Sequence, residues 1–105
     1  MASISRRKGH HRSRIEIVAD ILEIAKNGAL KTRIMYLGNL SFDLLEKYLE
    51  MLSASGLLQH QNGPERTYMV TEKGQHFLED YYELEKNLEI VDSKKRLLER
   101  NLTGP

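Results

Sequence analysis

Apolar residues recur at helical spacing directly after Ser13. The positions that share one helical face are Ile15, Val18, Ile21, Leu22 and Ala25, and Ile17 and Ile24 widen that face. Acidic residues at positions 16, 20 and 23 occupy the other side. Ser13 and Glu16 fit a capping box, in which the hydroxyl accepts from a backbone amide and the glutamate reaches back to the cap. The pattern predicts a first helix that begins after Ser13 and stops at Asn27-Gly28, because glycine tolerates the left-handed conformation that ends helices.

The next segment is short and predicts one strand and one small helix. Residues 29–31 favour a brief strand that adds to a later hairpin. Thr32 is placed to cap a two-turn helix that ends at Gly38. Ile34 and Leu37 are the residues that this helix is expected to bury.

A third helix is predicted from the cap at Ser41 to the stop at Gly56. Leu40 and Leu45 occupy the positions of a hydrophobic staple, which fixes how the chain enters a helix. The predicted buried stripe is Leu44, Leu45, Tyr48, Leu49 and Leu52. The predicted exposed face is acidic, since it carries Asp43, Glu46 and Glu50 against Lys47.

Two short segments, residues 57–60 and 67–70, read as the strands of a hairpin. The loop between them contains Asn62-Gly63, a strong hairpin signal, and Pro64 makes the loop longer than a two-residue turn. Three helices followed by such a hairpin are typical of a winged helix-turn-helix domain, in which the hairpin is the wing. The predicted fold class is mainly α with a small β-hairpin.

The last predicted helix is longer than a small winged domain needs. Thr71 caps it and Glu72 is well placed at its positive end. From Glu72 to Leu102 it spans roughly 46 Å at the 1.5 Å rise per residue. Steps of four and three residues connect the positions of one unbroken edge, called here the seam: Phe77, Tyr81, Leu84, Leu88, Val91, Lys95, Leu98 and Leu102.

The seam predicts a partner for the last helix. Beyond Leu84 the helix has outrun the core of its own domain, and each large side chain left exposed forgoes about 1.5–3 kcal/mol of burial. A second copy of the helix is the simplest cover, with Lys95 reaching solvent or a partner's acidic group. The alternative is a helix folded back over its own domain, since Ile90 and Leu97 lie off the seam. The pattern alone leaves parallel and antiparallel pairing open.

Length and composition exclude several classes of protein. The chain has 105 residues, the size of one domain, and contains no cysteine that could form a disulfide or a thiolate zinc site. No segment reaches the length of a membrane span, so no membrane association is expected. No metal, cofactor or catalytic residue is predicted, because His60 and His76 lack evident acid–base partners and no glycine-rich phosphate loop is present. The adjacent His10 and His11 have no acidic neighbour, so they are weak evidence for metal.

The formal net charge of +1 hides an asymmetry. Residues 1–40 carry eight Lys/Arg and three acidic residues, whereas residues 41–105 carry eight and twelve. Such a split indicates a polyanion-binding end, although a solvated tail beside a solvated helix gives the same numbers. Residues 1–12 have no apolar period and are expected to form a mobile basic arm.

Three features together resemble the small archaeal winged-helix DNA-binding proteins of the Sulfolobus 10a type. They are the run "LKTRIMYLGNLSFDLLEKYLEMLSASGLL", the wing that ends "YMVTEKG", and the long heptad helix after it. The resemblance covers about residues 13–102. It implies a homodimer through an antiparallel coiled coil, and binding of double-stranded DNA with little sequence preference in a chromatin-like or regulatory role. It also implies that residues 41–55 form the recognition helix, with Lys31 and Arg33 as phosphate contacts.

The acidic face of the third helix departs from what base reading requires, which is Arg, Lys, Asn or Gln near the helix start. Affinity is therefore expected to be mostly electrostatic. The candidate DNA contacts are Arg6, Arg7, Lys8, Arg12, Arg14, Lys31, Arg33, Ser41, Lys47 and Arg66.

The rival hypothesis is a protein-interaction dimer, in which exposed Phe42 and Met51 contact a protein partner. In either case the expected organisation is a basic arm at 1–12, a winged helix-turn-helix domain at 13–76 and a dimerisation helix at 77–105. The expected location is the cytoplasm, in association with the nucleoid.

Overall fold

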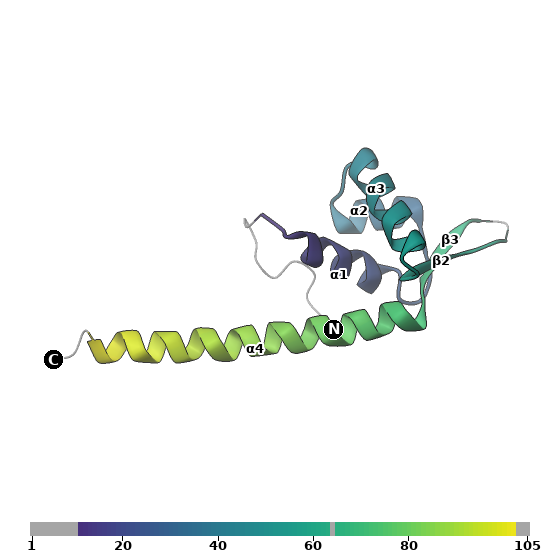
Figure 1. Ribbon diagram of the computed structural model, residues 1–105. Helices are drawn as coiled ribbons and strands as arrows, with labels where there is room; N and C mark the ends of the chain where they lie inside the picture. Colours follow the sequence, from purple (N-terminus) through teal and green to yellow (C-terminus); the bar gives the residue numbers. More distant parts are fainter. Residues whose placement is uncertain (1–10, 64, 103–105) are drawn as a thin grey trace.

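The computed structural model describes residues 11–63 and 65–102. It is mainly helical with one small sheet, as predicted, and a single long helix runs away from a compact group of shorter elements (Figure 1). The elements in chain order are α1 (Arg14–Ile24), β1 (Ala29–Leu30), α2 (Lys31–Gly38), α3 (Phe42–Ala54), β2 (Leu58–Gln61), β3 (Thr67–Val70) and α4 (Glu72–Leu102).

The sheet has three antiparallel strands in the order β1-β3-β2, so β3 is central. Ala29 pairs with Tyr68, and Leu58 pairs with Val70. The predicted β3 is confirmed to the residue, whereas β2 lies one residue later than predicted. The brief first strand is confirmed at Ala29–Leu30, and Lys31 belongs to α2 instead of the strand.

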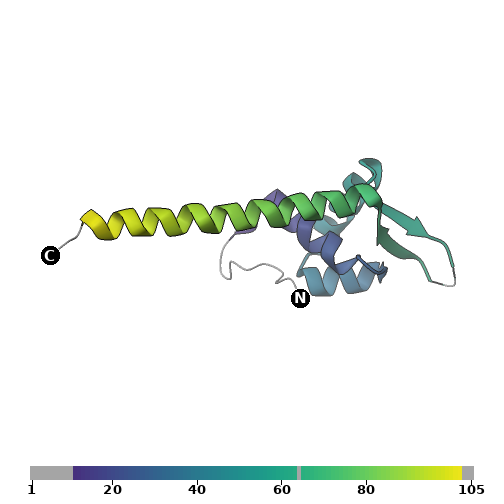
Figure 2. The same cartoon turned by 90° about the horizontal axis from the view of Figure 1, so that it is seen from below.

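All four helices contribute to one core. The largest fully buried side chains are Ile21, Leu22, Ile34, Leu45, Leu52 and Leu78. Leu40 and Leu45 are both buried, in agreement with the predicted staple. Figures 1 and 2 show α1 beside the first part of α4, while the rest of α4 extends beyond every other element. The molecule accordingly measures 67 × 26 × 23 Å.

Side-chain caps start three of the four helices. The amide of Glu16 donates to Ser13 Oγ at 3.1 Å, and the amide of Ser13 donates to Glu16 Oε1 at 2.7 Å, which confirms the capping box. The amide of Leu44 donates to Ser41 Oγ at 3.2 Å. Thr71 Oγ1 accepts from the amide of Gly74 at 3.0 Å.

The start of α4 is also tied to the end of α3. Thr71 Oγ1 donates to the carbonyl of Gly56 at 2.6 Å. Gly74 lies so close to the preceding chain that an added Cβ would sit 2.4 Å from the carbonyl oxygen of Leu57 and 2.6 Å from Val70 Cγ1. The direction in which α4 leaves the domain is therefore held by hydrogen bonds and by close packing.

The prediction that Thr32 caps α2 is wrong. The helix begins at Lys31, and Leu30, in the cap position, makes no side-chain hydrogen bond. Leu30 is extended because it pairs in β1, so the chain passes directly from strand to helix and leaves no residue for a polar cap.

Three apolar residues that were predicted to be buried are exposed. Ile15 is 50% exposed, Leu37 42% and Leu44 36%. Each lies on the edge of its helix, and Ile17 is buried in place of Ile15. The opposite error concerns Asp20, which was predicted on the solvated side but is only 5% exposed. A guanidinium partner, described below, accounts for its burial.

Candidate nucleic-acid interface

The outer face of α3 is acidic, as predicted. Asp43, Glu46, Lys47 and Glu50 are all exposed on it. Leu45, Leu49 and Leu52 on the opposite side are buried and hold the helix on the domain. Near its start the helix offers Ser41, whose hydroxyl already accepts from the amide of Leu44. This face therefore presents three carboxylates and a single cation.

Lys31 does not stand in open solvent. Its ammonium forms an ion pair with Glu46 of α3, and it lies 4.6 Å from the centre of the Phe42 ring. The contact joins the first residue of α2 to the first two turns of α3. Sequence analysis missed this pair because residues 31 and 46 are brought together only by the turn between the two helices.

Arg12 is held by the fold. Its Nη1 donates to Asp20 Oδ2 at 2.7 Å, and its Nη2 donates to the carbonyl of Asn39 at 3.2 Å. The side chains of the ion pair are only 16% and 7% exposed. Arg12 was predicted to belong to a mobile arm, but these contacts fix it between α1 and the turn after α2. Arg14 is exposed and its Nη2 lies 3.0 Å from the sulfur of Met51.

Three of the predicted contacts remain open to an outside anion. Arg33, Lys47 and Arg66 are exposed and form no ion pair within the part of the chain that the structure describes. They come from α2, α3 and the wing respectively. The predicted contacts Arg6, Arg7 and Lys8 lie outside the described residues.

A hollow of about 480 Å³ separates α3 from the wing and brings together residues distant in the sequence. It is lined by Glu46, Lys47, Leu49, Glu50, Ser53, His60, Arg66 and Tyr68. On its wing side the rings of His60 and Tyr68, which pair across β2 and β3, meet edge to face at 4.4 Å between centres. Lys47 and Arg66 thus share one concave surface with two carboxylates.

The seam on α4 changes character along the helix. Phe77 and Tyr81 are partly buried against the core, as predicted. The Tyr81 hydroxyl donates to Glu85 Oε2 at 3.0 Å, and burial together with that carboxylate raises the pKa of Tyr81 above its usual value. The exposed seam residues, with their exposed fractions, are Leu84 (44%), Leu88 (43%), Val91 (54%), Leu98 (64%) and Leu102 (86%).

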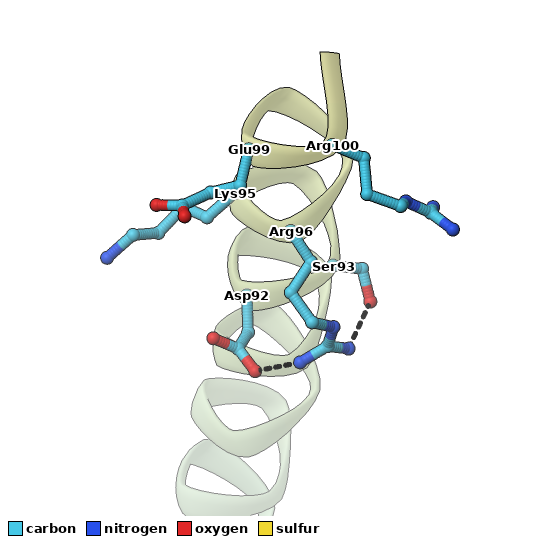
Figure 3. A pocket seen from close by; sticks show the side chains of 6 residues that line it. All are labelled: Asp92, Ser93, Lys95, Arg96, Glu99 and Arg100. Atoms are coloured by element: carbon cyan, nitrogen blue, oxygen red, sulfur yellow. Dashed lines mark hydrogen bonds and ion pairs between the residues drawn. The ribbon is translucent and has the colours of Figure 1, made fainter. Parts of the chain in front are cut away.

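The far end of α4 is polar around the one charged seam position. Figure 3 shows Lys95 and Glu99 extending to one side of the helix and Arg100 to the other. Arg96 Nη1 donates to Asp92 Oδ2 at 2.5 Å across one turn, and both side chains are about two-thirds exposed. An exposed pair of this kind adds little stability. The helix therefore keeps its apolar edge without support from its own chain.

Over residues 11–89 the chain matches the winged helix-turn-helix family, and it belongs to that family. An uncharacterized protein of Methanocaldococcus jannaschii is 34% identical over 91 residues, which cover 86% of this chain and 88% of that protein. Among solved structures the fold is similar to Sso10a-2, a DNA-binding protein from Sulfolobus solfataricus, with a TM-score of 0.67 and 27% identity. That match covers 83% of this chain and 96% of the other, so the predicted resemblance is confirmed.

The fold is also shared with regulators of the MarR family. One from Neisseria meningitidis matches with a TM-score of 0.56 and 15% identity, over 83% of this chain and 77% of the other. At that identity the likeness concerns the fold alone. The family and these structures place the chain in a class of proteins that are not enzymes. Within the described residues, no helix is long and apolar enough to cross a membrane.

Proposed function

We propose that this protein is a dimeric, winged-helix DNA-binding protein whose affinity is mostly electrostatic and only weakly sequence-specific. The observation that carries the proposal is the similarity to a DNA-binding protein over nearly the whole length of that protein, long terminal helix included. A chromatin-associated or regulatory role in the nucleoid follows from that binding mode.

The charge distribution supports weak base readout. Asp43, Glu46 and Glu50 project from α3, the helix that a winged-helix protein inserts in the major groove, and carboxylates repel phosphates. At best a carboxylate accepts from a cytosine amino group. The cations that make no internal ion pair surround this helix on α2 and the wing, where they would neutralise phosphates without reading sequence.

The arm and the helix divide the work in this proposal. Residues 1–12 are the basic arm, 13–76 the winged domain and 77–105 the dimerisation helix. In a dimer every phosphate contact occurs twice. If six to ten phosphates are neutralised, affinity falls about 10³- to 10⁵-fold between 50 and 200 mM salt.

The seam also selects a pairing for the two helices. In an antiparallel pair with Leu88 opposite Val91 of the second copy, every seam position meets a seam position. The layers are then Phe77 with Leu102, Tyr81 with Leu98, Leu84 with Lys95, and Leu88 with Val91. A parallel pair would instead place the two Lys95 side chains opposite each other. The antiparallel arrangement sets the winged domains at opposite ends of the rod.

Cysteine cross-linking tests the pairing, because the chain has no native cysteine. Leu88→Cys and Val91→Cys are made separately and mixed under mild oxidation. The antiparallel pair predicts a disulfide between the two different variants and little in either variant alone. Efficient cross-linking of Leu88→Cys with itself would contradict it.

Deleting residues 1–10 separates DNA binding from the rival function, a protein-interaction dimer. The rival is favoured by Phe42, which is 56% exposed beside the acidic face of α3. The deletion removes Arg6, Arg7 and Lys8 but keeps Arg12, which has a structural role. We expect a loss of most of the affinity for duplex DNA and an unchanged melting temperature. Unchanged affinity would show that the arm does not contribute.

A further inference from the structure

The pair formed by Lys31 and Glu46 joins the two helices of the helix-turn-helix. Lys31 is the first residue of α2, and Glu46 lies in the second turn of α3. The Phe42 ring covers the ammonium from another side at 4.6 Å. The Lys31 side chain is consequently only 33% exposed.

The pair is poorly explained as a stabilising device. Ion pairs exposed to this degree contribute little to folding, and the Glu46 side chain is 46% exposed. A lysine at the first position of a helix is also placed against the positive end of the helix dipole. The carboxylate of Glu46 offsets that unfavourable charge, and it occupies the ammonium that would otherwise face an outside anion.

We propose that Glu46 is an internal competitor for DNA phosphate at Lys31 and so sets the affinity of the interface. The inference rests on the proposed DNA-binding function and names a residue that weakens it. In the unbound protein Lys31 is neutralised by Glu46. A phosphate must displace that carboxylate before Lys31 contributes to binding.

The same helix supplies a matched control. Glu50 lies one turn after Glu46, is exposed, and forms no ion pair within the described part of the chain. Replacing either glutamate with glutamine removes one negative charge from the same face of α3. Only Glu46→Gln also releases Lys31.

The experiment measures affinity for a random-sequence duplex as a function of salt for the full-length wild type and four variants. These are Glu46→Gln, Glu50→Gln, Lys31→Gln and the double variant Lys31→Gln/Glu46→Gln. Loss of an exposed ion pair predicts a gain of about 2- to 5-fold per site for Glu46→Gln. Each Lys31 that reaches a phosphate should steepen the slope of log affinity against log salt by about 0.9.

We expect Glu50→Gln to raise affinity less and to leave the salt slope unchanged. In the Lys31→Gln background, Glu46→Gln should give only the gain seen for Glu50→Gln. Equal gains and slopes for the two single glutamine variants, or a full gain without Lys31, would overturn the inference and leave the proposed function standing. Wild-type protein that fails to bind duplex at 50 mM salt would overturn both.

Discussion

Arg12 and Asp20 form an ion pair that is almost hidden from solvent, with 2.7 Å between Nη1 and Oδ2. The same guanidinium donates to the carbonyl of Asn39, the left-handed residue that ends α2. One side chain therefore connects the residue before α1, the middle of α1 and the turn that leads to α3. A residue that looks like part of a DNA-binding arm in the sequence is an anchor of the fold.

Replacing Arg12 with alanine should destabilise the domain. The change removes the guanidinium from a carboxylate that is only 7% exposed, and breaking a buried pair in this way costs about 3 kcal/mol or more. For a domain of this size the melting temperature should fall by roughly 10 °C. Arg14→Ala is the control, since Arg14 is exposed, and it should change stability by less than about 0.5 kcal/mol. Equal effects of the two substitutions would contradict the anchoring role.

Gly74→Ala should reverse the usual sign of a glycine substitution in a helix. Alanine normally stabilises a helix interior by about 1 kcal/mol relative to glycine. Here the added Cβ would lie 2.4 Å from the Leu57 carbonyl, and forcing the backbone apart costs about 1–3 kcal/mol. Urea denaturation should show a net loss of stability. Gly63→Ala has no atom nearer than 3.8 Å and should have little effect.

Lys47→Gln and Arg66→Gln should each weaken DNA binding uniformly across sequences. Both residues lie beside the hollow between α3 and the wing and form no ion pair within the described residues. Removal of one phosphate contact lowers the salt slope by about 0.9. Lys86→Gln, on the exposed surface of α4, is the matched control and should leave the slope unchanged. A loss confined to one DNA sequence would instead indicate base readout.

Leu88→Glu should convert the proposed dimer to monomers, because it places a carboxylate in the middle of the seam. Ile90→Glu is a fair control, since Ile90 is similarly exposed in the single chain but lies off the seam. Light scattering should give the molar mass of one chain for Leu88→Glu and of two for Ile90→Glu. If Leu88→Glu dimerises as strongly as the wild type, the interface lies elsewhere.

The sequence predicts the fold well where one strong local signal decides. Thr71 as a cap, and the absence of a breaker before Leu102, give α4 its correct bounds. The hydroxyl and the glutamate of the capping box place the start of α1. The start of α2 at Lys31 was not predictable in this way, because β1 forms only through pairing with a strand nearly forty residues later.

The candidate interface was less predictable, since its charges depend on contacts between distant residues. The sequence identifies Lys31 and Arg12 as cations but cannot show that Glu46 and Asp20 are their partners. Both partners were read as solvated acidic residues on a helix face. Tertiary pairing thus changes which cations are open to DNA, while the acidic face of α3 follows directly from its helical period.

The most direct test of the central proposal is a salt titration of binding to random-sequence duplex DNA, with the molar mass of the protein measured in the same buffers. The account predicts a dimer throughout and a log–log salt slope of about −5 to −9, corresponding to six to ten neutralised phosphates. It also predicts similar affinities for random and genomic sequences. Binding that is nearly independent of salt, or a monomer that binds as tightly as the dimer, would contradict it.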